Sequence, residues 1–407
     1  MHGSVDPWVP TEMGAHMRWI DDVPVFGDPV DPEALQQIQR CRATADAAAL
    51  MADHHIGYAV PIGGVVVYKD ALSPSGVGFD IGCGNKAVLT DMPGIEARTR
   101  IAPLMDAIAD QLSFGMGQKN KRRADSPVFD RDEWRLPEAA KLKTLARDQL
   151  GTVGSGNHYV DLFTDEQDRV WVGVHFGSRG LGHKLATHFL EAGGARDAIH
   201  EPPLVIPAGH ALFDDYVAAM TLAGAFAYAG RDWVCAEVVR MLGARVLDEV
   251  HNHHNFAWLE EHNGEQVWVV RKGATPAFPG QRGFVGGSMG DDAVIIEGVD
   301  SPLARTAWHS TVHGAGRVMS RSAAKGKVDR KTGEVVRAGL VSREMMSDWV
   351  RKRGVELRGA GTDEAPQCYK RLPEVLGHHE GTIRVLNTLR PIGVAMAGDK
   401  EFDPYRD

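Results

Sequence analysis

The sequence has few of the features that mark secreted, membrane-bound or disulfide-stapled proteins. Only four cysteines occur among its 407 residues, and Cys41, Cys83, Cys235 and Cys368 are too widely spaced to form a Cys-x-x-Cys pair or a dense disulfide framework. No apolar run is long enough for a transmembrane helix, and the chain does not open with a basic stretch followed by an apolar one. We therefore expect a protein of the reducing cytoplasm that has no membrane partner.

Positive charge is also scarce. The chain has 45 lysines and arginines against 54 aspartates and glutamates, which gives a net charge of -9. Because the average surface would repel phosphate, a nucleic-acid partner would require basic residues gathered in one place. With 43% hydrophobic and 24% charged residues the composition is otherwise that of a globular protein, and it supports neither a disordered nor a fibrous class.

Repeats, low-complexity tracts and long Pro/Ser/Gly linkers are missing, which favours one intertwined domain over residues 1–407. Helices are predicted over residues 31–52 (opening with Asp31-Pro32), 137–150, 212–241 (with a break near Gly230) and 342–353. Strands are predicted over residues 64–68, 87–90, 171–176, 267–270 and 293–296. Residues 1–30 lack periodicity and are expected to be irregular. The predicted fold class is α+β, a single large mixed domain with interspersed strands and helices.

Several glycine-rich segments carry side chains suited to chemistry. In Gly78-Phe79-Asp80-Ile81-Gly82-Cys83-Gly84-Asn85, the glycines free the backbone to turn a carboxylate and a thiol toward one point, where a metal could bind. For this segment alone, a glycine turn with a capping aspartate and a buried cysteine is the more common explanation.

A second glycine-rich segment, Gly151-Thr152-Val153-Gly154-Ser155-Gly156-Asn157-His158, could cradle a phosphate with its backbone N–H groups. It lacks the Gly-Lys-Ser/Thr ending of a P-loop and the spacing of a dinucleotide-binding fingerprint, so it fits neither of these nucleotide-binding folds.

Histidines are concentrated in two further places. His175 lies at the end of a predicted buried strand, just before Ser178 and Arg179, although a strand-end histidine is more often structural than a ligand. His251, His253 and His254 lie within His-Asn-His-His-Asn, and the dipole at a helix C-terminus could explain one of these three but hardly all of them.

The last such segments combine glycine with cations. Arg271-Lys272-Gly273 precedes Gly286-Gly287-Ser288-Met289-Gly290, which suits phosphate recognition. His313 is followed by Arg317 and Arg321, which would share one face if a helix began here. The alternative is a glycine-capped helix start with solvated arginines.

Taken together, these segments resemble the RNA-splicing ligase RtcB family. The matching stretches run in order from about Met51 to Tyr369: Met51-Ala52-Asp53-His54, Pro61-Ile62-Gly63-Gly64, Asp80-Ile81-Gly82-Cys83-Gly84, Gly154-Ser155-Gly156-Asn157-His158, His175-Phe176-Gly177-Ser178-Arg179-Gly180-Leu181-Gly182-His183, His254-Asn255, Arg271-Lys272-Gly273-Ala274, Gly287-Ser288-Met289-Gly290 and His313-Gly314-Ala315-Gly316-Arg317-Val318-Met319-Ser320-Arg321.

The resemblance implies a site for two Mn²⁺ ions. Cys83 would bridge them, with His158 and His175 on one ion and Asp80 and His254 on the other. His254 is preferred over His251 because the family's ligand directly precedes an asparagine. Softness alone would favour zinc for a thiolate with imidazoles, so manganese is implied by the resemblance only, and zinc could bind more tightly and inhibit.

The resemblance also implies the reaction. His313 would attack the α-phosphate of GTP, and the GMP would pass to an RNA 3′-phosphate, itself produced from a 2′,3′-cyclic phosphate where necessary. Attack by an RNA 5′-hydroxyl would then form an ordinary phosphodiester. The natural RNA, the oligomeric state and a requirement for a protein activator are left open.

Residues implied to contact the guanylate are Asn157, Ser288, His313, Gly314, Ala315, Gly316 and Tyr369, and residues implied to bind phosphate or RNA are Arg179, Arg317 and Arg321. Three positions depart from the family. Asp161 replaces a glutamate, Ala293 replaces a serine, and the lysine that reads guanine is replaced by Met396 or Ala397 in an atypical tail over residues 394–407. We expect Lys400, a few residues further on, to contact the base instead.

These departures keep other functions open. One alternative is a divergent nucleic-acid end-repair ligase with altered nucleotide or substrate preference, which the tail supports. A metal-dependent hydrolase would need zinc and no nucleotide. A non-catalytic RNA-binding protein is disfavoured, because no ligand or nucleophile of the family pattern is missing.

Overall fold

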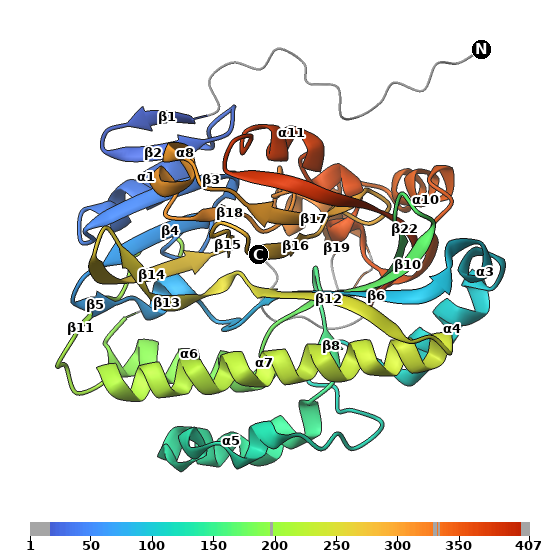
Figure 1. Ribbon diagram of the computed structural model, residues 1–407, viewed down its shortest axis with the longest axis horizontal. Helices are drawn as coiled ribbons and strands as arrows, with labels where there is room; N and C mark the ends of the chain where they lie inside the picture. The colour runs from blue at the N-terminus through green and yellow to red at the C-terminus, as the bar shows by residue number, and fades with distance from the viewer. Residues whose placement is uncertain (1–16, 196–197, 329–331, 333, 400–407) are drawn as a thin grey trace.

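The computed structural model describes residues 17–195, 198–328, 332 and 334–399, and it confirms the α+β class: strands and helices are interspersed along the chain in one mixed fold (Figure 1). Two large sheets form its upper part in this view, and long helices cover them from below. Although one of these helices is long, none of the described helices is apolar enough to cross a membrane.

The first sheet has six strands. In order across the sheet they are β1 (Met17–Ile20), β2 (Val23–Phe26), β3 (Ala47–His55), β4 (Ile62–Tyr68), β14 (Glu265–Lys272) and β13 (Asn255–His262). All neighbours are antiparallel except β2 and β3. Central strands β3 and β4 are almost wholly buried, so they read as continuous apolar runs.

The second sheet has eight strands. These are β12 (Val246–His253), β6 (Gly84–Pro93), β10 (Arg169–Phe176), β9 (Tyr159–Thr164), β22 (Ile383–Gly398), β17 (Ala293–Gly298) and β16 (Arg282–Val285), with β21 (Glu356–Ala360) parallel to β22. Shorter paired strands are β5 (Ala71–Leu72) with β11 (Ile206–Pro207), β7 (Ser113–Phe114) with β8 (Thr152–Gly154), β15 (Ala274–Pro276) with β18 (Ser310–Val312), and β19 (Gly326–Val328) with β20 (Val335–Ala338).

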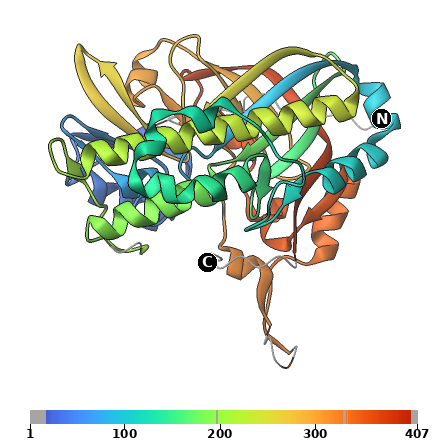
Figure 2. The same ribbon diagram turned by 90° about the horizontal axis from the view of Figure 1, so that it is seen from below.

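The helices are α1 (Pro32–Arg42), α2 (Pro74–Val77), α3 (Gly94–Thr99), α4 (Ile101–Gln111), α5 (Pro137–Gln149), α6 (Arg179–Ala192), α7 (Phe213–Leu242), α8 (Pro302–Thr306), α9 (Arg321–Lys325), α10 (Arg343–Lys352) and α11 (Leu372–Gly377). Helix α7 packs against β6 and β10, and α5 and α6 pack on each other (Figures 1 and 2). Helix α7 contributes to two separate apolar clusters, with its first half in one and its second half in the other.

Most predicted elements are confirmed, but the first helix is much shorter than predicted. Asp31 caps it as expected, since its carboxylate accepts hydrogen bonds from the backbone N–H groups of Glu33 (2.9 Å) and Ala34 (3.0 Å). The helix ends at Arg42, and the alanine-rich stretch that follows forms β3. Alanine favours helix locally, but here its small side chains fill the buried centre of a sheet, so tertiary packing overrides propensity.

The predicted break in α7 near Gly230 is wrong, because the helix is continuous over 30 residues. A Cβ at Gly230 would lie 3.2 Å from the Phe176 ring, and one at Gly224 would lie 2.7 Å from the Phe256 ring. These glycines therefore bring the helix close to the sheets rather than interrupt it.

Both ends of the chain also differ from expectation. Residues 17–26, predicted to be irregular, form the hairpin β1–β2, whose turn places Asp21 at a φ of 52°. At the other end, residues 394–398 are the last part of β22 and not a separate tail. Residues 1–16 and 400–407, with Lys400 among the latter, lie outside the described part.

Candidate active site

One edge of the eight-stranded sheet gathers the predicted metal ligands. Cys83 precedes β6, His158 precedes β9, His175 is near the end of β10, and His254 follows β12. Neighbouring strands of this set are antiparallel, with His175 opposite both Asn85 and Tyr159, so these starts and ends lie at the same edge. The strand order thus brings together residues that are far apart in the sequence.

An edge of the six-stranded sheet faces the same space. Asp53 and His55 end β3, Ile62 begins β4 and Lys272 ends β14. His254 is the single residue between β12 of one sheet and β13 of the other, and its backbone N–H donates to the carbonyl of Cys83 at 2.8 Å. A cavity of about 580 Å³ is lined by residues from both edges.

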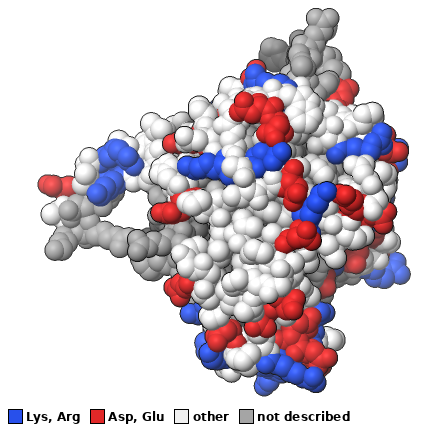
Figure 3. All heavy atoms as spheres, turned by 90° about the vertical axis from the view of Figure 1, so that its left-hand side faces the viewer, with Lys and Arg blue, Asp and Glu red and all other residues white. Residues whose placement is uncertain are grey.

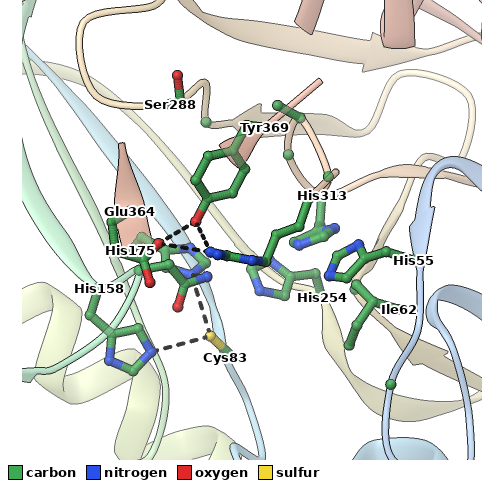
Figure 4. Close-up of a pocket in the computed structure, with 18 of the residues that line it drawn as sticks. His55, Ile62, Cys83, His158, His175, His254, Ser288, His313, Glu364 and Tyr369 are labelled. Atoms are coloured by element: carbon green, nitrogen blue, oxygen red, sulfur yellow. Dashed lines mark hydrogen bonds and ion pairs between the residues drawn. The ribbon is translucent and has the colours of Figure 1, made fainter. Parts of the chain in front are cut away.

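Five side chains at this edge, Asp80, Cys83, His158, His175 and His254, form what we call the donor cluster, and Figure 4 labels all of them except Asp80. Cys83, His175 and His254 place one donor atom each within 4.8 Å of one another, and so do Asp80, Cys83 and His158. The Cys83 sulfur lies 3.8 Å from His158 Nε2 and 3.7 Å from His175 Nε2. Cys83 therefore belongs to both groups and could bridge two ions.

This grouping differs from the pairing implied by the family resemblance. His158 lies with Asp80, whose carboxylate is 3.1 Å from His158 Nε2, and not with His175. His175 instead stacks on His254, with ring centroids 5.1 Å apart. Cys83 directly precedes β6, and the strands that lead to His175 (β10) and His254 (β12) lie on the two sides of β6, so both imidazoles can reach the sulfur.

Hydrogen bonds from neighbouring residues fix the orientation of the donor atoms. Asn85 donates its amide N–H to the carbonyl of Phe284 (2.8 Å), so its oxygen accepts the Nδ1–H of His175 (2.6 Å). This fixes the tautomer and leaves the Nε2 lone pair of His175 directed at Cys83. In Figure 4 the dashed lines from His158 and His175 meet at the Cys83 sulfur.

Arg231 binds two of the three neighbouring histidines, His251 and His253, and not His254. This fully buried guanidinium lies 2.8 Å from His251 Nε2 and 2.9 Å from His253 Nδ1, and it also donates to the carbonyl of Gly82. Both histidines are on β12, where alternate residues share a face, whereas His254 lies beyond the strand. Of the three, only His254 belongs to the donor cluster.

The electrostatics of the donor cluster suit a cation. Burial and the Asp80 carboxylate raise the pKa of the Cys83 thiol well above its usual range, and burial lowers the pKa values of His175 and His254 well below theirs. The buried Nδ1 of His254 has no hydrogen-bond partner among the described residues. Neutral imidazoles, a displaceable thiol proton and a buried nitrogen without a protein partner are properties that fit a metal-binding site.

His313 lies beside this cluster and is held by Asp53. One oxygen of Asp53 accepts the Nδ1–H of His313 (2.6 Å) and its backbone N–H (2.9 Å). Burial alone would raise the pKa of Asp53, but the charge and hydrogen bonds of His313 hold it below its usual range. With Nδ1–H directed at Asp53, the neutral form of His313 carries its lone pair on Nε2, and the His313 ring lies 4.8 Å from that of His254.

The candidate phosphate-binding arginines meet at a carboxylate. Glu364 contacts Arg317, Arg321 and the hydroxyl of Tyr369, and Arg317 also donates to that hydroxyl at 3.0 Å. The two arginines do not share a helix face as predicted, since α9 begins only at Arg321. Glu364 instead brings them together at the cavity wall, and Figure 4 shows its carboxylate beside the hydroxyl of Tyr369.

Four residues of β9 and β22 form a second group, the Asp161 cluster. Asp161 is opposite Val394, Tyr159 is opposite Met396, and all four line the cavity. The Tyr159 hydroxyl and one Asp161 oxygen are buried without a hydrogen-bond partner among the described residues. Burial raises the pKa of Asp161 well above its usual range, although the backbone N–H of Ala395 partly offsets this.

The cavity lining contains most of the predicted residues: Asp80, Cys83, Asn157, His158, His175, His254, Ser288, His313, Gly314, Ala315, Gly316, Arg317, Arg321 and Tyr369. Arg179 lies just behind it, 3.2 Å from His158 Nδ1. Ala293 is buried in β17 and does not line the cavity, and Lys400 lies outside the described residues. No role was predicted for Asp53, Asn85, Arg231 or Glu364. Only Asp53 left a signal in the sequence, as a charge directly after the apolar run of residues 47–52.

Comparison with known sequences agrees with this arrangement. The family profile described as tRNA-splicing ligase RtcB matches residues 34–136 and 134–397. The RNA-splicing ligase RtcB of Escherichia coli K12 is 32% identical, over 90% of this chain and 94% of its own length. The tRNA-splicing ligases RtcB of Pyrobaculum aerophilum (31%, over 85% and 86%) and Thermococcus kodakarensis (30%, over 91% and 94%) are similar to a comparable extent.

Proposed function

The chain belongs to the RtcB family of RNA ligases, and we propose that it joins RNA ends through a GMP group carried on His313, with GTP as the nucleotide and Mn²⁺ as the metal. One observation carries this proposal. An imidazole whose Nδ1–H is held by a buried carboxylate, and whose Nε2 is free, lies next to a histidine of the donor cluster in one cavity. This is the arrangement that a histidine nucleophile needs.

The first step transfers GMP to the protein. The Nε2 lone pair of His313 attacks the α-phosphorus of GTP, a P–N bond forms, and the bond from phosphorus to the bridging oxygen breaks to release pyrophosphate. Asp53 orients the ring and stabilises the positive charge that develops on it, as a buried carboxylate does for a catalytic histidine. Because Asp53 also accepts the backbone N–H of His313, the ring and its backbone are fixed together.

The donor cluster fits a pair of divalent cations. Cys83, His175 and His254 would hold one ion, and Asp80, Cys83 and His158 the other. When bound, they would withdraw electron density from phosphoryl oxygens and neutralise developing negative charge. The carboxylate and the neutral imidazoles are ligands that manganese accepts, while the thiolate would also suit zinc, so the choice of manganese rests on the family.

The later steps use the RNA. An oxygen of an RNA 3′-phosphate attacks the phosphorus on His313, which breaks the P–N bond and leaves GMP on the RNA end. A 5′-hydroxyl then attacks the 3′-phosphorus, GMP leaves, and a phosphodiester remains. Arg317 and Arg321 line the cavity and contact Glu364. They would bind the RNA phosphate by exchanging these contacts for contacts with its oxygens.

Incubation with Mn²⁺ and GTP labelled at the α-phosphate, followed by denaturing electrophoresis, tests the proposal. We expect a covalent, acid-labile label on the wild-type protein, as for a phosphoramidate. His313→Ala should lose the label and keep its metal, because His313 does not belong to the donor cluster. An acid-stable adduct, or a label that persists in His313→Ala, would show that another residue, such as a lysine, is the nucleophile.

One observation favours a second candidate, a family member with changed nucleotide preference. Met396 lines the cavity near the position where the resemblance implies a lysine that reads guanine. Transfer from ATP at a rate close to that from GTP would support this candidate.

We also place the protein in a reducing compartment such as the cytoplasm. All four cysteines are free and buried, and a cysteine that serves as a metal ligand must stay reduced.

A further inference from the structure

Strands β19 and β20 form a two-stranded arm that leaves the body of the molecule. Figure 2 shows it in orange, extending well beyond the other elements. The described side chains on β20 are exposed throughout, and so is Lys327 on β19. A ribbon of this kind buries too little surface to be explained by its contribution to the core.

The arm begins at the rim of the cavity. Ser320 and Arg321 line the cavity, Arg321 opens α9, and β19 starts directly after that helix. On the return, Leu340 and Val341 donate their backbone N–H groups to the carbonyls of Ala323 (3.0 Å) and Ala324 (3.2 Å). The base of the arm is thus fixed to the same short helix that carries a cavity residue.

The cations at this base are neutralised within the protein. Arg321 contacts Glu364, Lys325 lies 2.9 Å from Asp363, and Arg343 lies 2.6 Å from Asp399. They hold the arm in place, and their charge is already balanced.

The two described cations further along the arm are not balanced. Lys327 and Arg337 are directly opposite each other across the two strands, so they share one face. Neither forms an ion pair with a described residue, and like charges in this position destabilise a hairpin. The Arg337 guanidinium donates to the carbonyl of Ser322 at 2.7 Å, which holds it beside the cavity residue Arg321.

A lysine on an exposed strand can also serve to prevent unwanted strand pairing. Val335 and Val336, which are 66% and 60% exposed, would need such protection. That role accounts for one charge at an edge, but not for two facing cations on a ribbon that starts at the cavity. An anionic strand leaving the cavity would relieve their repulsion.

We propose that the arm binds the phosphodiester backbone of the RNA strand whose end lies in the cavity, with Lys327 and Arg337 as the contacts. The inference rests on RNA being the substrate. With a net charge of -9, the protein needs a local group of cations to bind RNA. The surface seen from the side of the six-stranded sheet mixes both signs without a large basic patch (Figure 3), and the arm would supply such a group.

Binding of a fluorescein-labelled single-stranded RNA with a 3′-phosphate, measured by anisotropy over a range of salt concentrations without GTP, tests the proposal. For Lys327→Ala/Arg337→Ala we expect roughly tenfold weaker binding at low salt, and a salt dependence of log K lower by about 1.4, or about 0.7 for each lost phosphate contact. Lys327→Arg/Arg337→Lys should behave as wild type, and so should Lys119→Ala, which removes a lysine that is 73% exposed at another surface site.

A dinucleotide with a 3′-phosphate should bind wild type and variant equally, because it does not reach the arm. An unchanged salt dependence in the double variant would overturn the proposal. So would a variant that self-associates while its RNA affinity is unchanged, which would assign the charges to protection against strand pairing or to a protein contact.

Labelling by GTP in the absence of RNA separates this inference from the proposed function. The double variant should be labelled as well as wild type. If neither protein is labelled and wild type still binds RNA through the arm, the proposed function fails and the arm inference stands. If wild type does not bind RNA at all, the arm inference fails, whatever the labelling shows.

Discussion

The donor cluster and the Asp161 cluster line the same cavity but are prepared in opposite ways. In the donor cluster, most side chains are held in place: Asn85 orients His175, and Asp80 and Arg179 flank His158. In the Asp161 cluster, the Tyr159 hydroxyl and an Asp161 oxygen are buried with no partner among the described residues. Within the donor cluster only the Nδ1 of His254 is buried without such a partner, and the other donors have the fixed geometry that a small ion requires.

The same contrast appears in how closely the two clusters follow the family pattern. All five donor residues match it, whereas Asp161 and Met396 do not. A buried polar atom without a partner costs free energy, on the order of 1 to 3 kcal/mol. A ligand that satisfies these atoms would recover that free energy, which is why the Asp161 cluster is where the second candidate, a changed nucleotide preference, can be tested.

The largest expected effect is that of Cys83→Ala. Because Cys83 belongs to both donor groups, we expect loss of both ions and of all GTP labelling with the fold retained, as measured by metal analysis and circular dichroism. Cys235→Ala is the matched control, since Cys235 is buried in α7 and is not part of the donor cluster. If Cys83→Ala still bound two ions and were labelled normally, the donor cluster would not be the metal site, and nothing would then distinguish it from the Asp161 cluster.

A smaller loss is expected for Asp53→Asn. The amide would present an N–H to His313 and favour the tautomer with the proton on Nε2, so the nucleophile would be blocked. By analogy with other histidine–carboxylate pairs, labelling in a single turnover should slow by about 100- to 10,000-fold while metal content stays unchanged.

Asp46→Asn is the control for this change, because Asp46 is an exposed carboxylate that accepts the backbone N–H of Lys69. Unaltered labelling in Asp53→Asn would mean that the orientation of His313 is set elsewhere.

Substitutions at and near the Asp161 cluster should have smaller effects, and they should change only the preference between GTP and ATP. A charged hydrogen bond to a purine carbonyl contributes about 1.5 to 3 kcal/mol, so if Lys400 contacts the base, Lys400→Ala should weaken GTP use by roughly ten- to a hundredfold and change ATP use much less. Met396→Lys should raise the preference for GTP over ATP by a similar factor. If Lys400→Ala transfers from GTP and from ATP at the same rates as wild type does, that lysine is excluded from the site.

The smallest effect concerns pH. The raised pKa of the Cys83 thiol means that it is protonated near neutral pH and must lose its proton when a metal binds, while the lowered pKa values of His175 and His254 leave them neutral already. Metal affinity should therefore rise by about tenfold per pH unit between roughly pH 6 and pH 8. Titration calorimetry in buffers of different ionisation enthalpy should detect one released proton, and pH-independent affinity would contradict the assignment.

Much of the site could be predicted from the sequence, because its ligands lie in glycine-rich segments that match a family pattern in order. The division of the donors into groups could not, since it depends on the distances between side chains that the fold brings together from β6, β9, β10 and β12, and strand order is set by long-range packing. Glu364 was missed for a related reason: it lies in a short turn, and only the fold places it against Arg317 and Arg321.

The fold shows the same limit. Capped helices such as α10, where Ser342 accepts the N–H of Met345, were predicted nearly to the residue because their signals are local. The strand β3 was mistaken for helix because its alanines favour helix when taken alone, and only its neighbours β2 and β4 make it a strand.

The single-residue connection at His254 has a consequence for how this protein can change over evolution. One added or deleted residue between β12 and β13 would turn His254 away from Cys83, because side chains alternate along a strand, or would shift a whole sheet by one position. Such a chain would keep every ligand in its sequence and still lose the site. The length of this junction is therefore as tightly constrained as the identity of the histidine that it holds.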